Sequence, residues 1–191
     1  MARAGVTPEK VESVAADVVD EAGWETLTLA AVAGRLGVSV PSLYKHVDGM
    51  AGVRRRLTIR AVSELAQRLV EAAVGRAGPD ALGPVAHAYR DFARQHPGLY
   101  AATVVAPTPG DHEHHAASDR VLMPVLAMID GYGVPGDQAI DAARLLRATL
   151  HGFVSLELAG GFGLPVDVDT SFDRTLVALD RSLSTWPPQA G

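Results

Sequence analysis

Apolar residues recur at intervals of three and four positions along most of this chain, which is the spacing of one face of an α-helix. The first such run lies between Pro8 and Gly23 and contains Val11, Val14, Ala15, Val18, Val19 and Ala22. Thr7 stands before it. Threonine is a favoured N-cap, proline fits the first helical turn, and glycine commonly follows the last helical residue. The pattern therefore predicts a helix that begins at Pro8 and stops at Gly23.

Two shorter helical patterns follow directly. Thr28 is placed to cap the first of them, whose apolar face consists of Leu29, Val32, Ala33 and Leu36, and Gly37 ends it. Ser39 is then the natural N-cap of the next helix, with Pro41 in its first turn, where a missing N–H costs little. Two short helices joined through a glycine and braced by a longer one form a helix-turn-helix.

The remainder of the chain repeats the helical spacing without a convincing strand or an internal repeat. Loops are expected at residues 75–84 and 106–115, Pro124 is expected to kink its helix, and Asp169 or Thr170 should cap the last helix. We therefore predict an all-α fold of about nine helices, with a domain at residues 1–56 and a larger helical domain at residues 57–191. The six further helices are predicted at residues 50–74, 84–95, 99–104, 118–129, 137–158 and 169–183.

Composition narrows the class of protein. Hydrophobic residues make up 48% of the 191 residues and aromatic residues only 5%, a balance that favours close-packed helices. The absence of cysteine excludes disulfides, thiolate metal sites and cysteine nucleophiles. No apolar run reaches membrane-spanning length, and the N-terminal segment lacks the apolar core of a signal peptide. We expect a cytoplasmic protein with no membrane partner.

Charge is distributed unevenly along the chain. Residues 1–60 carry eight Lys or Arg and seven Asp or Glu, whereas the remainder carries nine and fifteen, giving a net charge of −5. A nearly neutral N-terminal part on an acidic body suits a protein whose N-terminal end approaches a polyanion.

The third predicted helix has few apolar residues and many hydrogen-bonding groups. Leu43 and Val47 lie four positions apart and share an inward face, so the residues that point outward or flank that face are Pro41, Ser42, Tyr44, Lys45 and His46. Hydroxyl, ammonium and imidazole groups can contact base edges and phosphates, and a proline ring can pack on a thymine methyl. A solvated helix face is the alternative, but the helix-turn-helix context favours a helix that lies in the DNA major groove.

Residues 7–56 resemble the N-terminal domain of the TetR family of transcriptional regulators. The matching residues are Thr28, the turn Leu36–Ser39, and Pro41–Val47. The resemblance implies that the third helix is the recognition helix and that Tyr44 and His46 contact the phosphate backbone and nearby bases. It also implies a lysine near the start of the fourth helix, where this chain has Met50. The candidate DNA-binding residues are Thr28, Ser39, Pro41, Ser42, Tyr44, Lys45 and His46.

The C-terminal part resembles the ligand-binding domain of a TetR subgroup with a Trp-His-Gly signature, through Leu150–Phe153, Leu156-Glu157 and Gly160–Phe162. Arg147 stands where that pattern has its tryptophan. From the residues alone, Arg144, Arg147 and His151 form a polar stripe that could line a cavity, face solvent or cross a dimer contact. Aromatic and thioether side chains on several helices predict a largely apolar pocket with one or two polar anchors, and ordinary packing in the core is the alternative. The candidate ligand-binding residues are Tyr89, Phe92, Tyr100, Met123, Met128, Arg147, His151 and Phe153.

Three other patterns carry no chemistry. Gly131–Gly136 matches G-x-G-x-x-G, but it follows a helix, and Pro135 lacks the N–H that a phosphate would need. The histidines of His112–His115 lie in an expected loop without ordered ligand spacing. Serine, histidine and aspartate occur without a nucleophile-elbow motif. We expect no catalytic residue, no metal site and no cofactor.

Together these patterns predict a ligand-responsive, DNA-binding transcriptional regulator that acts as a repressor and binds a palindromic operator on double-stranded DNA as a homodimer. Residues 1–56 would bind DNA, and residues 57–191 would bind a small apolar or aromatic effector. The last two helices carry more apolar surface than a monomer needs and would form the dimer contact. The alternative is a helical ligand-binding or scaffolding protein whose helix-turn-helix contacts another protein.

Overall fold

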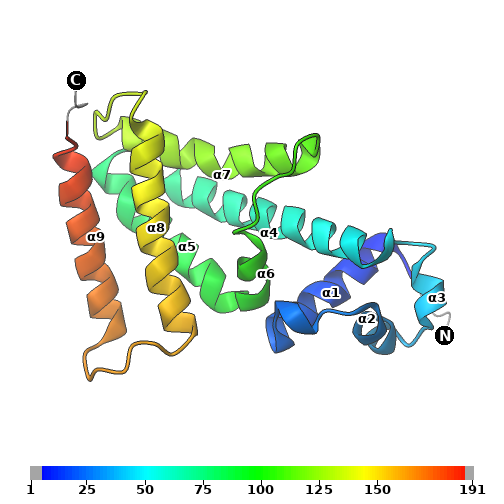
Figure 1. Ribbon diagram of the computed structural model, residues 1–191. Coiled ribbons are helices and arrows are strands. Elements are labelled where there is room, and N and C mark those ends of the chain that lie inside the picture. The colour runs from blue at the N-terminus through cyan, green and yellow to red at the C-terminus, as the bar shows by residue number, and fades with distance from the viewer. Residues whose placement is uncertain (1–5, 188–191) are drawn as a thin grey trace. The chain divides into compact units, whose positions relative to one another are not determined.

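The protein is entirely helical in the part that the structure, a computed structural model, describes, which is residues 6–187 (Figure 1). No strand occurs there, so the expected all-α fold of nine helices is confirmed. No helix in this range is long and apolar enough to cross a membrane. The elements are α1 (Pro8–Ala22), a short 3₁₀ helix η1 (Trp24–Thr26), α2 (Leu29–Leu36), α3 (Val40–Leu43), α4 (Gly49–Ala73), α5 (Pro79–Gln95), α6 (Pro97–Ala102), α7 (His112–Asp130), α8 (Ala139–Leu158) and α9 (Val168–Ser184).

The helices divide into two compact units that do not follow a single cut in the sequence. Within the described residues, the first unit combines residues 6–64 with Gln95–Ala117, and the second combines Leu65–Arg94 with residues 118–187. The division into a DNA-binding domain at residues 1–56 and a ligand-binding domain at residues 57–191 stays a prediction. Residues 57–64 continue α4 within the first unit, where α6 packs on α1 and Asp111 is bonded to Arg55 of α4.

The first unit is built on the capping and glycine signals of its sequence. Thr7 Oγ1 accepts from the N–H of Lys10 at 3.2 Å and caps α1, as predicted. Gly37 ends α2 in the left-handed conformation with φ of 66°, which glycine adopts without a steric penalty. The fully buried side chains of Val11, Val19 and Leu43 lie in the core of this unit.

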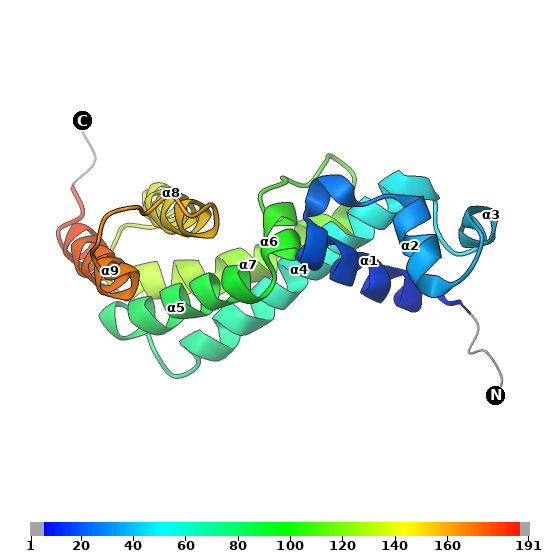
Figure 2. The ribbon, with the colours of Figure 1, turned by 90° about the horizontal axis from the view of Figure 1, so that it is seen from below.

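Helix α6 lies beside α1 within the first unit, as Figure 2 shows. Asp20 of α1 accepts the N–H of Leu99 at 2.9 Å through Oδ1, and its Oδ2 lies 2.9 Å from His96 Nδ1. Gly98 lets the two backbones touch, because a Cβ at that position would lie only 2.0 Å from the carbonyl oxygen of Val19. The contact is therefore specified by one carboxylate and one glycine.

Helix α5 begins at Pro79, five residues earlier than the predicted start at residue 84. Pro79 is the first residue of the helix. Pro84, which was predicted to be its first residue, lies inside it instead.

Helix α7 begins at His112, so the histidines that were expected in a loop form its first turn. Asp111 caps this turn, because its Oδ1 accepts from the N–H of His114 at 3.1 Å. The last helix, α9, is capped by Asp167, whose Oδ1 accepts from the N–H of Thr170 at 2.7 Å, and not by Asp169 or Thr170.

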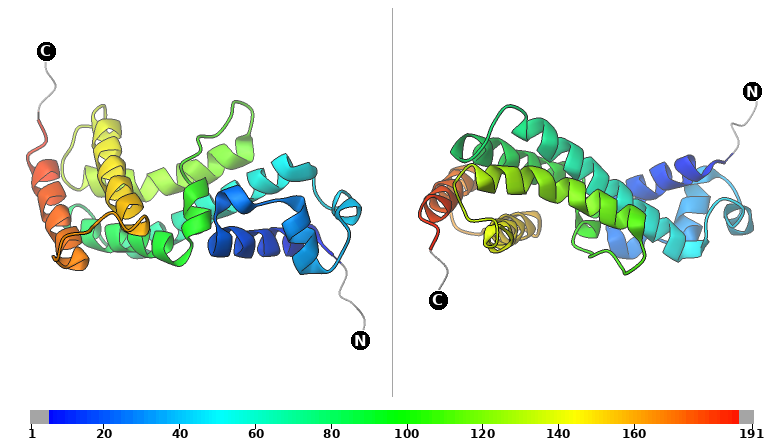
Figure 3. Two further views of the ribbon diagram at one scale, coloured as in Figure 1. Left: turned by 60° about the horizontal axis from the view of Figure 1, so that its bottom comes forward. Right: turned by 90° about the horizontal axis from the view of Figure 1, so that it is seen from above.

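The second unit has its core along α5, α7, α8 and α9, and two further views of its helices are given in Figure 3. Phe92, Ile129, Phe172 and Leu183 are at least 98% buried. The loop before α5 approaches the end of α7 closely: Gly78 donates its N–H to the carbonyl oxygen of Met128 at 3.1 Å. A Cβ on Gly131 would lie 2.3 Å from the nitrogen of Gly78, so this crossing needs a glycine.

Candidate DNA-binding and ligand-binding sites

The third helix presents its apolar and polar residues on opposite sides, as the sequence predicted. Leu43 is fully buried and Val47 is 7% exposed, so both lie in the core of the first unit. The N–H groups of His46 and Val47 both donate to the carbonyl oxygen of Leu43, at 2.8 and 3.1 Å, which continues the turn beyond α3. This fixes the direction in which the intervening side chains point.

The side chains on the opposite side are available to a partner. Tyr44 is 60% exposed. Pro41 and Lys45 are exposed, and Ser42 and His46 are half-buried. A ring, an ammonium, an imidazole and a hydroxyl therefore share one short surface, and these groups suit contacts to bases and phosphates.

Ser39 occupies the predicted N-cap position of α3, but its side chain makes no capping hydrogen bond. Its Oγ instead lies 2.9 Å from Oγ of Ser42, and either hydroxyl can donate. Two of the candidate DNA-binding residues thus fix one another. The remaining donor and acceptor positions of the two hydroxyls are therefore oriented by this hydrogen bond and not by a capping bond to the start of α3.

Thr28 has the capping role that its position predicted. Its Oγ1 accepts from the N–H of Ala31 at 3.1 Å at the start of α2. The hydroxyl is exposed and keeps its own proton as a donor, so the cap does not prevent a hydrogen bond to a phosphate oxygen. Its contact with DNA remains a prediction.

Three arginines near the start of α4 have different environments. The guanidinium of Arg54 lies over the ring of Trp24, 5.5 Å from its centroid. Arg55 donates to Asp111 at 2.6 and 2.7 Å. Arg56 is exposed. Met50, the second residue of α4, supplies no charge at the terminus where the family resemblance implies a lysine.

The eight candidate ligand-binding residues do not lie in a single unit. Phe92 and Met128 are at most 1% exposed and lie in the second unit, whereas Tyr100 is on α6 in the first. Met123 is 68% exposed, which in this chain places it outside any enclosed cavity. Tyr89 is buried, Phe153 and His151 are half-buried, and Arg147 is exposed. A ligand site formed by these residues therefore remains a prediction, and only for those of them that lie in the second unit.

His151 is the polar group on α8 best placed to serve as an anchor. Burial lowers its pKa, and the positive charge of Arg147 lowers it further, so the imidazole is neutral at pH 7. Its Nε2 lies 3.4 Å from Oγ of Ser155. Arg144 and Arg147 are both exposed, and Arg144 pairs with Asp141 at 3.1 Å. Of the three alternatives for the polar stripe, solvent or a dimer contact therefore suits the arginines, and only His151 is half-buried.

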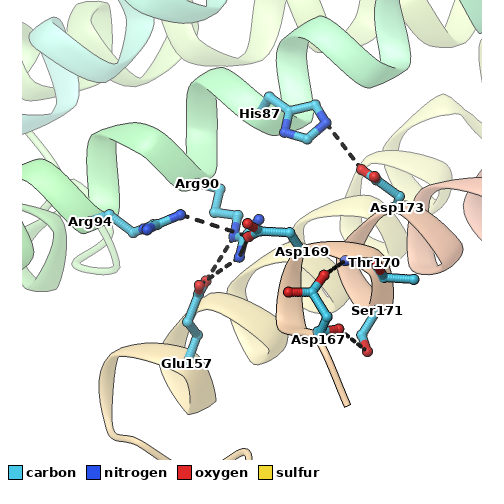
Figure 4. Close-up of polar contacts among 9 residues, drawn as sticks. All are labelled: His87, Arg90, Arg94, Glu157, Asp167, Asp169, Thr170, Ser171 and Asp173. Carbon is cyan, nitrogen blue, oxygen red and sulfur yellow. Dashed lines mark hydrogen bonds and ion pairs between the residues drawn. The ribbon is translucent and has the colours of Figure 1, made fainter.

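An ionic cluster that the sequence analysis did not predict joins three helices of the second unit (Figure 4). The guanidinium of Arg90, on α5, donates to Glu157 of α8 at 2.6 and 2.8 Å and to Asp169 of α9 at 2.6 Å. The side chain of Arg90 is 4% exposed, and its charge lies 4.6 Å from the ring centroid of Phe172. Hydrogen bonds to the two carboxylates raise the pKa of Arg90 although burial opposes them.

The Arg90 cluster holds the end of α8 and the start of α9 against α5. A single arginine on the apolar face of α5, which also carries Val85, Tyr89 and Phe92, is the signal that could have revealed it. A buried arginine needs carboxylate partners, but the sequence alone does not identify them.

Comparison with known proteins agrees with this architecture. Residues 82–179 match the family described as Tetracyclin repressor-like, C-terminal domain. The chain is 37% identical over 189 residues to the HTH-type transcriptional regulator Rv0681 of Mycobacterium tuberculosis, covering 98% of this chain and 86% of that one. It is 32% identical over 167 residues to the HTH-type transcriptional regulator YobS of Bacillus subtilis, covering 87% of this chain and 86% of that one.

A solved structure shows the same fold at low identity. The TetR-Q116A protein of Acinetobacter baumannii, in complex with minocycline, matches with a TM-score of 0.72 and 20% identity, over 97% of this chain and 100% of that chain. The chain belongs to the TetR family of helix-turn-helix transcriptional regulators. Its relatives are named as regulators of transcription, and the protein is a regulator and not an enzyme.

Proposed function

We propose that this protein is a ligand-responsive repressor that binds a palindromic operator as a homodimer and is released by a small apolar or aromatic molecule. The observation that carries the DNA-binding part is the division of the third helix into a buried side, Leu43 and Val47, and an accessible side. On the accessible side, Pro41, Ser42 and Lys45 would contact or approach bases, while Thr28, Tyr44 and His46 would contact phosphates.

Apolar side chains that remain exposed on the last two helices support the homodimer. Ile140 is 40% exposed, Leu156 53% and Val177 51%, on α8 and α9. Burying such a surface against the same surface of a second copy gives a four-helix contact across a two-fold axis. The proposed dimer has a mass of about 40 kDa, twice the 20.0 kDa of the chain. Its recognition helices would be spaced by one turn of B-DNA, about 34–36 Å.

The effector site is proposed in the second unit, with the neutral, half-buried imidazole of His151 as its polar anchor. A neutral polar anchor favours a largely apolar ligand with one hydrogen-bonding group over a sugar phosphate. The resemblance to the Trp-His-Gly subgroup, which also includes His151, belongs to this proposal. The minocycline complex of the Acinetobacter relative supports a small-molecule site in this fold.

Repression and release would follow from a shift between two populations. The effector binds better to the form whose recognition helices are wrongly spaced for DNA, so its binding lowers the fraction of protein that can occupy the operator. Because an operator lies on the chromosome, the proposed place of action is the cytoplasm.

A fluorescence anisotropy titration tests the proposal. Purified protein is added to a labelled duplex from upstream of its own gene and, separately, to a scrambled duplex of equal length and composition, at one stated salt concentration. We expect the upstream duplex to bind at least about 10³-fold more tightly. Equal affinities for the two duplexes at that salt would refute operator binding there and favour the alternative, a helix-turn-helix used for contacts with protein.

A further inference from the structure

The start of α7 is held to α4 by one arginine within the first unit. Arg55 Nε donates to Asp111 Oδ2 at 2.7 Å, and Arg55 Nη2 donates to Asp111 Oδ1 at 2.6 Å and to Glu113 Oε2 at 3.0 Å. The two parallel hydrogen bonds to Asp111 fix the direction of the guanidinium as well as its distance. The Asp111 side chain is only 12% exposed, so water competes weakly for its oxygens.

The same carboxylate also determines where α7 begins. Asp111 Oδ1 accepts from the N–H of His114 at 3.1 Å, which is a capping hydrogen bond. Because one carboxylate bonds both the first turn of α7 and Arg55 of α4, movement of that turn must either move Arg55 with it or break the ion pair.

The first turn of α7 also contains a buried polar atom that destabilises it. His114 is 4% exposed, and its buried Nε2 has no hydrogen-bond partner in the described part of the chain. A buried nitrogen without a partner loses its hydration without compensation. The turn is therefore stabilised by Arg55 and destabilised by the unpaired Nε2 of His114, so the contact with Arg55 contributes much of what holds it in place.

Helix α7 continues from this turn into the second unit. His112–Ala117 belongs to the first unit, and Ser118–Asp130 belongs to the second unit and carries Met123 and Met128, two of the candidate ligand-binding residues. We propose that the Arg55–Asp111 contact links α7 to the DNA-binding helices, so that a change in the second unit that displaces α7 reaches α4 through Asp111. This inference rests on the proposed function and identifies the contact through which an effector would change DNA binding.

The coupling can be tested without knowing the effector. Coupling between two sites is reciprocal, so if α7 affects DNA binding, then DNA must affect α7. Hydrogen exchange is measured by mass spectrometry on the full-length protein, with and without saturating upstream duplex. In the wild-type protein, DNA should change the exchange rates of amides in residues 118–130 by about fivefold or more, in addition to protecting α2 and α3.

Asp111→Asn is the informative variant, because asparagine retains the N-cap but has no charge for Arg55. We expect this variant to keep the DNA-dependent protection of α2 and α3 and to lose the change in residues 118–130. Asp119→Asn is the matched control, since it removes an equal charge from an exposed position of the same helix. It should behave as the wild-type protein does.

Each outcome decides a separate question. Wild-type protein that does not bind the upstream duplex contradicts the proposed function. Normal DNA binding without any change in residues 118–130, or a change that persists undiminished in Asp111→Asn, overturns the link through Asp111 and leaves the proposed function intact. Loss of the change in Asp119→Asn as well would also overturn it, because the effect would then follow charge on α7 and not the contact with Arg55.

Discussion

Replacing Arg90 by methionine should destabilise the second unit substantially. Arg90 is 4% exposed, makes three hydrogen bonds of 2.6–2.8 Å to carboxylates, and holds Glu157, which is 16% exposed. Methionine can occupy much of the same space, but it leaves the carboxylate of Glu157 half-enclosed without its cation.

The size of the effect follows from the burial of each partner. Breaking a buried ion pair by removing one partner costs about 3–5 kcal/mol, and because Glu157 retains some access to water we expect about 3 kcal/mol. Asp169 is 70% exposed and adds little. For a chain of this length that loss corresponds to a fall in Tm of about 6–12 °C, which thermal unfolding followed by circular dichroism measures directly.

Arg94→Met is the matched control on the same helix, because Arg94 is 51% exposed and its Nη1 lies 3.9 Å from Asp169 (Figure 4). It should change the free energy of unfolding by no more than about 0.5 kcal/mol. The double variant Arg90→Met/Glu157→Met should recover most of the loss, since an apolar pair can replace a buried ion pair at little cost. Equal losses in Arg90→Met and Arg94→Met would refute a role that depends on burial.

Three further changes have defined outcomes. Met50→Lys adds a phosphate contact in each subunit, so the slope of log affinity against log salt should steepen by about 1.8 for the dimer, equally on operator and random DNA. An unchanged slope in salt titrations would mean that the start of α4 does not approach the DNA phosphates. Gly98→Ala places a Cβ 2.0 Å from the carbonyl oxygen of Val19, so it should lower the free energy of unfolding by about 2 kcal/mol or more. Gly34→Ala is the control in thermal unfolding. A Cβ there would have no atom within 4 Å, so this variant should be neutral or stabilising. Arg55 lowers the pKa of Asp111 to about 2, so the stability that the ionised Asp111 contributes is complete above its unfolded-state pKa of about 4 and is lost as the pH falls from about 4 to about 2. Asp111→Asn should lack this loss of stability in acid unfolding. Identical acid-unfolding curves for the wild-type protein and the variant would contradict the ion pair.

The features that could be predicted from the sequence are those set by neighbouring residues. Thr7 and Thr28 accept backbone N–H groups three positions ahead, so their caps could be identified from residue type and position. The inward direction of Leu43 and Val47 likewise follows from their spacing of four. Local chemistry determines these features before any tertiary contact forms.

The features that could not be predicted depend on residues far apart in the sequence. The polar run His112–His115 lacks apolar spacing and was expected to be a loop, but it forms the first turn of α7, whose cap Asp111 is held by an arginine 56 positions earlier. The partners Arg90 and Glu157 are 67 positions apart. Asp167 caps α9, although Asp169 and Thr170 stand close by, because its Oδ1 accepts the N–H of Thr170, three positions ahead in the first turn.

Operator recognition by the third helix is tested most directly by the two lysines of the chain, Lys45 and Lys10. The affinities of wild-type protein, Lys45→Ala and Lys10→Ala for the upstream and scrambled duplexes are measured at one salt concentration. If Lys45 contacts a base edge, Lys45→Ala should weaken binding to the upstream duplex by about 1–3 kcal/mol and lower its preference over the scrambled duplex, while Lys10→Ala leaves the preference unchanged. A preference that Lys45→Ala leaves intact, with both duplexes weakened equally, would contradict recognition of the operator through Lys45 on this helix.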